Sequence, residues 1–218
     1  MAHHEIKDQY DEVQAEGLYE EGMARMALYH RHCQDPVIFR ALGDVGGKSL
    51  LDLACGDGFY TRKFRRAGAD PVMGVDLSPQ QIAKARRIEE REPLGIEYLA
   101  ADVVSLELEQ RFDVVTAIHL LHYLEGGTEI EAVLRKIHNA LEDDGCFVSM
   151  IANPEFDLES HDPEDSRTKF AYYFSVAEPP VSITSTGSSR SRRDFLLEFS
   201  SCRVLAEYTR LHPRVIVV

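Results

Sequence analysis

The sequence has few cysteines, no long apolar run and no excess of positive charge. Its four cysteines show no paired spacing and no Cys-x-x-Cys motif, and no secretory signal precedes them. A reducing, cytoplasmic environment is therefore expected. No apolar run approaches the ~20 residues that are needed to cross a bilayer, so we expect no membrane-spanning segment and no membrane partner.

Acidic residues outnumber basic ones, 37 to 24, which gives a formal net charge of −13. This charge repels phosphate backbones, and nucleic acid is therefore a poor candidate partner. With 218 residues, of which 44% are hydrophobic, the chain can bury the core of one α/β domain. The sequence carries no signal for a particular oligomeric state.

The most informative segment is a short apolar strand that runs into a glycine-rich turn. Residues 49–53 are mostly apolar but include Asp52, and the turn that follows reads Ala54-Cys55-Gly56-Asp57-Gly58. The turn residues are small or tolerate turn geometry, so the backbone can press against a ligand. A turn of this kind can cradle a nucleoside.

A second apolar strand, residues 72–75, ends in an acid, Asp76, eighteen residues after Gly58. In open parallel sheets ligands bind beyond the carboxyl ends of the strands, and an acid about 20 residues past the glycines binds the vicinal hydroxyls of a ribose. Two strand ends are therefore expected to converge on one nucleoside.

In these motifs the sequence resembles the class I S-adenosylmethionine-dependent methyltransferases. The family's first motif is an acid followed shortly by Gly-x-Gly, which matches residues 52–58. Its ribose acid corresponds to Asp76, its adenine-contacting acid after the third strand to Asp102, and its fourth strand to Phe112–Ala117. The likeness covers roughly residues 46–153, and several motifs in the right order are more specific than one glycine turn.

Neighbouring segments resemble one branch of that family. Residues 56–62 and 93–98, together with Tyr10, look like the branch that contains toxoflavin-type small-molecule N-methyltransferases. This likeness implies a small-molecule acceptor.

The resemblance implies a cofactor, S-adenosyl-L-methionine, and a role for each matching residue. The turn would contact the methionine part through its backbone, and Asp52 would help to orient the ammonium group. Asp76 would bind the ribose hydroxyls and Leu77 would lie against the adenine. Asp102 would accept from the exocyclic amine of adenine, and the amide of Val103 would donate to the ring. The implied cofactor-binding residues are Asp52, Ala54, Cys55, Gly56, Gly58, Asp76, Leu77, Asp102, Val103 and Ala117.

Two histidines after the fourth strand, His119 and His122, are the candidates for catalytic proton handling, because only histidine has an unperturbed pKa near neutrality. The alternative for each is a packed or surface histidine. Tyr10, Tyr19 and Tyr123 complete the expected substrate pocket together with the two histidines, and helix packing is the alternative for Tyr10 and Tyr19. Two histidines without a third ligand are a weak case for a metal, so no metal site is expected.

Two other nucleotide-binding classes fit less well. A dinucleotide oxidoreductase uses the motif Gly-x-Gly-x-x-Gly, whose third glycine allows close packing of the helix on the strand. Thr61 stands at the position of that third glycine here. Residues 46–49, Gly-Gly-Lys-Ser, superficially resemble a phosphate-binding loop, but Leu42 stands where that loop requires its first glycine.

Strands and helices alternate along the middle of the chain, which predicts an α/β fold with a Rossmann-like, mostly parallel sheet flanked by helices. We expect strands at 48–53, 71–75, 95–99, 112–117 and 146–152, and helices at 36–42, 58–67, 79–91 and 128–141. Asp35 is the expected cap of the first helix, and Thr128 with Glu131 forms a possible capping box for the last. Residues 143–145, Asp-Asp-Gly, are expected to form a turn.

A single methyltransferase domain is expected to span residues 1–218. It would comprise an N-terminal helical cap (1–45), a cofactor-binding core (46–153) and a divergent C-terminal segment (154–218). The resembled family places a further helix and an antiparallel strand pair after the fifth strand, and we expect those strands to be incomplete or altered here. The strand-like pieces of the C-terminal segment are Phe170–Val176, Val181–Thr184 and Arg214–Val218.

Together these features predict an S-adenosylmethionine-dependent methyltransferase that transfers a methyl group to a nitrogen or oxygen atom of a small molecule by direct displacement. The alternative is a catalytically silent or regulatory relative, which binds the same nucleoside but whose altered C-terminus leaves the acceptor pocket incomplete. The cofactor motifs are compatible with both. No readable motif identifies the acceptor.

Overall fold

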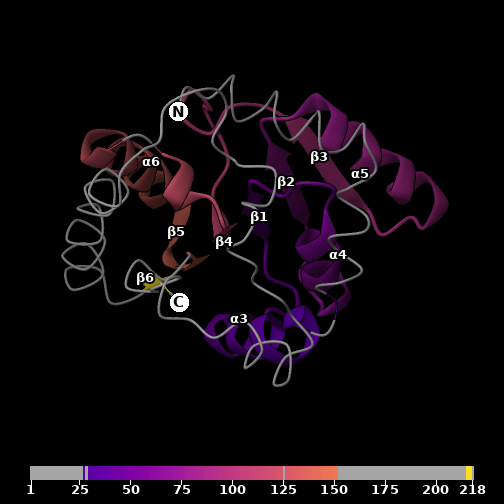
Figure 1. Cartoon of the computed structure of the whole chain (residues 1–218). Coiled ribbons are helices and arrows are strands. Elements are labelled where there is room, and N and C mark those ends of the chain that lie inside the picture. The colour runs from indigo at the N-terminus through magenta and orange to yellow at the C-terminus, as the bar shows by residue number, and fades with distance from the viewer. Residues whose placement is uncertain (1–26, 28, 125, 152–214, 218) are drawn as a thin grey trace, which may run out of the picture.

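The computed structural model describes residues 27, 29–124, 126–151 and 215–217. Its strands form one sheet in the order β3-β2-β1-β4-β5-β6, and all neighbours in it are parallel (Figure 1). The strands are β1 (Leu50–Leu53), β2 (Val72–Asp76), β3 (Ile96–Ala100), β4 (Phe112–Ile118), β5 (Leu141–Met150) and β6 (Val215–Val217). The predicted Rossmann-like α/β fold is confirmed. The strand order reverses between β1 and β4, and such a switch point is where open parallel sheets bind ligands.

Helices cover both faces of this sheet (Figure 1). They are α3 (Asp35–Leu42), α4 (Phe59–Arg66), α5 (Pro79–Arg91) and α6 (Gly126–Ala140), with a π-helical turn η1 (His30–Gln34) before α3 and a 3₁₀ turn η2 (Leu121–Tyr123) after β4. Side chains of α3, α4 and α5 belong to one buried cluster, and side chains of α6 belong to another. The sheet therefore separates two hydrophobic cores.

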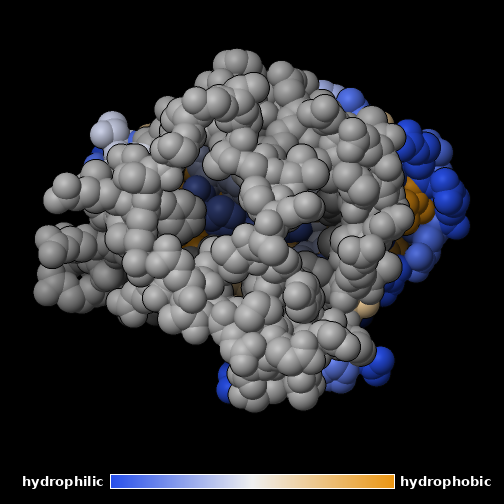
Figure 2. All heavy atoms as spheres, in the orientation of Figure 1, coloured by the Kyte–Doolittle hydropathy of each residue, from blue (hydrophilic) through white to orange (hydrophobic). Residues whose placement is uncertain are grey.

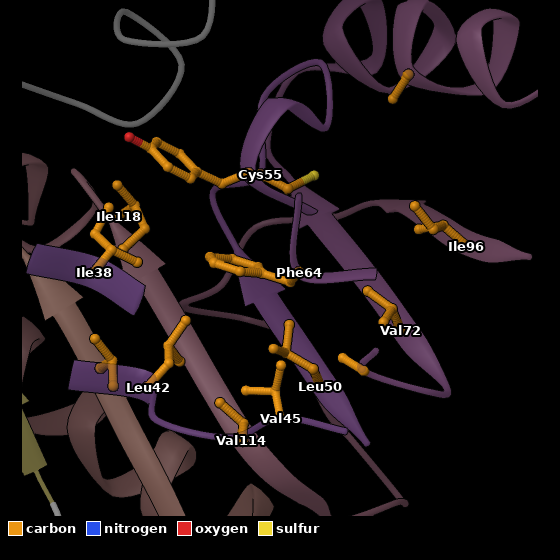
Figure 3. Close-up of a cluster of buried hydrophobic side chains, with 14 of the residues drawn as sticks. Ile38, Leu42, Val45, Leu50, Cys55, Phe64, Val72, Ile96, Val114 and Ile118 are labelled. Atoms are coloured by element: carbon orange, nitrogen blue, oxygen red, sulfur yellow. The ribbon is translucent and has the colours of Figure 1, made fainter. Parts of the chain in front are cut away.

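Strand β1 shows how the sequence produces this layering. All four of its residues are buried, which is the pattern of a strand covered on both faces. Leu50 points into the α3–α5 cluster and Leu51 into the α6 cluster, because successive side chains of a strand alternate. Figure 3 shows the first cluster, in which Phe64 from α4 lies between Ile38 and Leu42 of α3 and the strand side chains. Phe64 is fully buried.

Helix α5 begins and ends where the sequence predicts. The Ser78 hydroxyl caps it by accepting from the Gln81 amide at 3.2 Å, and Pro79 occupies the first turn, where its missing N–H costs nothing. Ile82 and Ala85 face the core, while the outer side of the helix is hydrophilic (Figure 2).

Three local predictions are wrong. Helix α6 starts at Gly126, so Thr128 lies inside the helix rather than at a capping box. Asp35 is in the first turn of α3 and is not its cap, and its carboxylate instead pairs with Lys63 of α4 at 2.6 Å. The turn predicted at residues 143–145 lies within strand β5, which starts at Leu141. The register between β4 and β5 shifts at this point, so these residues form an irregularity within the strand and not a turn before it.

The last strand, β6, falls within the strand-like piece 214–218. It pairs with β5 in parallel, Phe147 opposite Val215, and so differs from the antiparallel strand pair that the resembled family would place after β5. The predicted strands at 170–176 and 181–184 and most of the predicted N-terminal helical cap lie outside the described residues. The single-domain division of the chain stays a prediction.

Candidate functional site

A cavity of about 260 Å³ lies at the carboxyl ends of β1, β2, β3 and β4. This volume is close to the lower end of the roughly 300–1,000 Å³ of small-molecule sites. Eight of the predicted cofactor-binding residues line it: Asp52, Ala54, Cys55, Gly56, Asp76, Leu77, Asp102 and Val103. The structure therefore brings the three predicted acids to one common cavity.

The glycine-rich turn is held tightly against the end of β2. The Cys55 amide donates to the Val75 carbonyl at 3.0 Å, and the Gly56 amide donates to Asp76 Oδ2 at 2.8 Å. Ala54 and Gly56 both have φ of 56°, in the left-handed region that is unfavourable for alanine. The turn therefore keeps a strained backbone conformation where it borders the cavity, which is common at ligand sites.

Asp76 is fixed through both carboxylate oxygens. Oδ2 accepts from Gly56, and Oδ1 accepts from the Ser78 amide at 2.9 Å. An ionised carboxylate accepts hydrogen bonds at both of its oxygens and can bind a pair of hydroxyls. The geometry suits the predicted ribose contact.

Asp102 is positioned by the turn that follows β3. The Ala101 amide donates to the Asp76 carbonyl at 2.9 Å, which ties this turn to the end of β2. Asp102 Oδ1 accepts from the Val104 amide at 2.9 Å. Asp102 and Val103 therefore border the cavity beside Asp76, as the predicted adenine contacts require.

Asp52 is the most deeply buried of the three acids, with 2% of its surface exposed. It lies in the middle of the sheet between Gly74 of β2 and Thr116 of β4. Burial raises its pKa to about 6, although hydroxyl donors from Thr61 (2.6 Å) and Thr116 (2.7 Å) stabilise the charged form. A buried carboxylate in this state is suited to bind a cationic group.

Two predicted cofactor-binding residues, Gly58 and Ala117, are not among the residues that line the cavity. Gly58 is the N-cap residue of α4 and has φ of 81°, and a Cβ there would collide with the Tyr98 ring. Ala117 is fully buried in the α6 cluster. Their surroundings support packing roles, and their cofactor contacts stay predictions.

His119, a predicted catalytic residue, lines the cavity at the end of β4 and is part of a hydrogen-bond chain. Tyr60 donates its hydroxyl to Gln34 Oε1 at 3.1 Å, and Gln34 Nε2 donates to His119 Nε2 at 2.9 Å. Burial lowers the pKa of His119, and nearby His30 lowers it further. A neutral His119 that accepts at Nε2 carries its proton on Nδ1.

The other predicted catalytic histidine, His122, is not part of the cavity lining, whereas Tyr123 is. The His122 ring lies 5.8 Å from the His119 ring and 4.3 Å from the Tyr123 ring, centroid to centroid. Burial lowers the pKa of His122 to about 4. Tyr10 and Tyr19 lie outside the described residues.

Sequence reasoning missed several residues that line the cavity, notably His30, Gln34 and Tyr60. His30 and Gln34 come from η1, and Gln34 is 85 positions from its partner His119. No local motif signals such a long-range pairing. Tyr60 lies two residues after Gly58, and the only sequence signal for it is that it neighbours the glycine motif.

Within the described part of the chain, no three His, Cys, Asp or Glu side chains gather as a metal site would require. No helix there has the length and apolar character of a membrane span.

Comparison with known proteins agrees with this geometry. A family model described as a methyltransferase domain matches residues 50–145. The chain is 35% identical over 85 residues to ubiquinone biosynthesis O-methyltransferase of Nitrobacter winogradskyi, a match that covers 39% of this chain and 32% of that protein. The matches span between about a third and three fifths of the length of the first curated relatives.

Solved structures show the same likeness. An S-adenosylmethionine-dependent methyltransferase from Mesorhizobium loti is 36% identical with a TM-score of 0.50, over 55% of this chain and 53% of that chain. A complex of DhpI with SAH has a TM-score of 0.54 over 67% of this chain and 69% of that chain, and at 24% identity it supports the fold alone. The sequence motifs, the parallel sheet and these matches agree: residues 50–145 match a methyltransferase domain, and over this core the chain is similar to the class I S-adenosylmethionine-dependent methyltransferases.

Proposed function

We propose that this protein is an enzyme that transfers a methyl group from S-adenosylmethionine to a nitrogen or oxygen atom of a small molecule. The observation that carries the proposal is the meeting of Asp52, Asp76 and Asp102 at one cavity, each at or near the end of a different parallel strand. The toxoflavin-type branch remains a prediction within this proposal.

The residues present fit the methyl donor. The Asp76 carboxylate borders the cavity and can accept from two ribose hydroxyls, and Asp102 can accept from an exocyclic amine beside it. Asp52 offers a buried negative charge to the ammonium of the methionine part, which would offset the cost of burying that carboxylate. The strained turn at Ala54 and Gly56 presents its backbone to the same cavity.

The donor, when bound, supplies an activated methyl group whose sulfur leaves as a neutral thioether. The protein's own contribution is then mainly position and exclusion of water. Aligning the reacting atoms can lower the barrier by up to about 7–11 kcal/mol in well-oriented systems. Asp76 and Asp102 would fix the nucleoside end and Asp52 the ammonium end, which orients the donor between them.

A small acceptor is supported by charge and by size. The net charge of −13 opposes binding of nucleic acid, and the described cavity has a volume of about 260 Å³. The relative from Nitrobacter winogradskyi, named for ubiquinone biosynthesis, is an O-methyltransferase, and an oxygen acceptor is accordingly within the proposal.

The proposal is tested in two steps. Isothermal titration calorimetry with S-adenosylmethionine and S-adenosylhomocysteine measures donor binding, and mass spectrometry detects methylated products from a panel of phenols and nitrogen heterocycles. Binding followed by methylation supports the enzyme. Binding without any turnover would instead favour the silent, regulatory relative, and absence of binding would contradict both.

A further inference from the structure

Asp52 accepts a hydrogen bond at each carboxylate oxygen, and both bonds come from threonines. Thr61 of α4 donates its hydroxyl to Oδ2 at 2.6 Å, and Thr116 of β4 donates to Oδ1 at 2.7 Å. The other acceptor near the Thr116 hydroxyl, the Leu51 carbonyl, is farther away at 3.4 Å. Both short distances fall close to the roughly 2.5–2.7 Å of a hydroxyl bonded to an ionised oxygen. The two threonines therefore hold the carboxylate at both of its oxygens.

Asp52 lines the cavity, whereas neither of the two threonines is among the lining residues. Both threonines are fully buried. Thr116 lies directly opposite Asp52 in the register of β1 and β4, and Thr61 lies in the first turn of α4. Thr61 also stands where a dinucleotide-binding turn has its third glycine, and here that position supplies a hydroxyl to the strand. The two side chains can therefore act on a ligand only through Asp52.

The charge of Asp52 is not offset by a cationic side chain among the described residues. Burial raises its pKa, the bonds from the two threonines lower it, and the carboxylate of Asp76 raises it. The other titratable groups around it are Cys55, in the turn after β1, and Tyr60 of α4. Burial raises the pKa of both groups, and the charge of Asp52 raises them further, so both stay neutral. A buried charge without compensation is costly, and the ionised Asp52 depends on its two hydroxyl donors until a cation binds.

We propose that Thr61 and Thr116 are positioning residues, which hold the Asp52 carboxylate in the orientation that binds the ammonium group of the methyl donor. This inference rests on the proposed methyl transfer from S-adenosylmethionine. One hydroxyl comes from the helix and the other from the neighbouring strand, so the plane of the carboxylate is fixed before the ligand arrives. The site accordingly selects a nucleoside that carries an ammonium group over one that lacks it.

The test compares Thr61→Val and Thr116→Val with Ser149→Ala. Valine has nearly the shape of threonine but no hydroxyl, so each valine removes one hydrogen bond to Asp52. Thr61→Ser keeps the hydroxyl and is the rescue variant. Ser149 provides the matched control, because its buried hydroxyl donates to the Ala117 carbonyl at 2.8 Å and not to Asp52.

Isothermal titration calorimetry measures two ligands. S-adenosylhomocysteine carries the ammonium group, and 5′-methylthioadenosine has the same nucleoside and a thioether sulfur but no amino-acid part. At pH ~7 each valine variant should bind S-adenosylhomocysteine about tenfold more weakly, the effect of one hydrogen bond to a charged group, and 5′-methylthioadenosine as the wild type does. Thr61→Ser and Ser149→Ala should match the wild type for both ligands. In an Asp52→Asn background the effect of Thr61→Val should disappear.

The pH dependence of binding is a second readout. The ammonium group pairs with the ionised carboxylate, so the wild-type affinity for S-adenosylhomocysteine should rise with pH and level off above the Asp52 pKa of about 6. Loss of a hydroxyl donor raises the pKa of Asp52 further, so in Thr61→Val the same rise should occur at higher pH. The affinity for 5′-methylthioadenosine should not follow this profile.

The outcomes separate this inference from the proposed function. If the wild type binds neither ligand, the proposed function fails. If the wild type binds S-adenosylhomocysteine, the positioning role is overturned by valine variants with wild-type affinity, or by folded variants that lose both ligands to the same extent; the proposed function then stands. Should the valine variants not fold, the wild-type profile decides, because an affinity for S-adenosylhomocysteine as independent of pH as that for 5′-methylthioadenosine would also overturn the role.

Discussion

Replacing Asp52 by asparagine is expected to stabilise the ligand-free protein at neutral pH and to weaken its binding of the methyl donor. Burial raises the pKa of Asp52 from 3.8 to about 6. That difference of roughly 2 units corresponds to about 3 kcal/mol at ~1.4 kcal/mol per unit. The figure is an upper limit for the substitution, because asparagine exchanges two charged hydrogen bonds with Thr61 and Thr116 for neutral ones.

The sign follows from proton binding. The folded protein retains the Asp52 proton between pH 3.8 and about 6, whereas the unfolded chain releases it. The contribution of this group to the free energy of unfolding therefore falls as pH rises through that window and is level above it. Asparagine does not titrate, so the free energy of unfolding of the variant should increase relative to that of the wild type over the same pH window. The difference should reach up to about 3 kcal/mol at pH ~7.

Urea denaturation of both proteins between pH 4 and pH 8 measures this difference. A difference that does not change with pH would refute the account of Asp52 as a carboxylate destabilised by burial. Donor binding should change in the opposite direction, because the ammonium group loses its charged partner. Calorimetry at pH 8 should show binding of S-adenosylhomocysteine weakened by about 1.5–3 kcal/mol, and equal affinity would remove Asp52 from the ammonium site.

Three further substitutions test other parts of the structure. Asp76→Ala removes the predicted ribose acceptor, so calorimetry should show S-adenosylhomocysteine binding weakened by about 1.5–3 kcal/mol; unchanged affinity would reject the ribose contact. Gly58→Ala forces a side chain into a left-handed position against Tyr98, and urea unfolding should show a loss of at least ~1–2 kcal/mol, whereas a neutral result would contradict the packing role. Asp113 accepts from both the amide and the hydroxyl of Ser49, which lower its pKa. The contribution of Asp113 to the free energy of unfolding is complete above pH ~3.8 and is lost as pH falls through its lower folded pKa. In urea denaturation Asp113→Asn should therefore be less stable than the wild type by a constant amount near neutrality, and this difference should shrink only in acid. The pH dependence is the reverse of that expected for Asp52.

Much of the fold is readable from the sequence because the central strands β1, β2 and β4 are largely buried on both faces. Residues 50–53 and 72–75 are nearly continuous apolar runs, and each leads into a residue that ends the strand at the cavity. The sequence Ser78-Pro79 combines a side-chain cap with a proline in the first turn, so the start of α5 is encoded locally. A local signal of this kind predicts Asp76 at the end of its strand, whereas the roles of Asp52 and Asp102 come from the resemblance to the family.

Other features depend on contacts that a local pattern does not contain. Thr128 and Glu131 have the spacing of a capping box, but the helix extends past them to Gly126. Strand β5 starts earlier than its apolar run, because Leu141 pairs with Phe112 across an irregular register. The surroundings of His119 also depend on a long-range contact, because the Gln34–His119 hydrogen bond joins η1 to the end of β4. Such pairings appear only once the chain is folded.

The most direct test of the central claim is a crystal structure of this protein with S-adenosylhomocysteine. We expect one adenosine in the cavity, with its two ribose hydroxyls on Asp76, its exocyclic amine on Asp102 and the methionine ammonium near Asp52. An adenosine bound elsewhere, or bound in this cavity without contact to Asp76 and Asp102, would contradict the account.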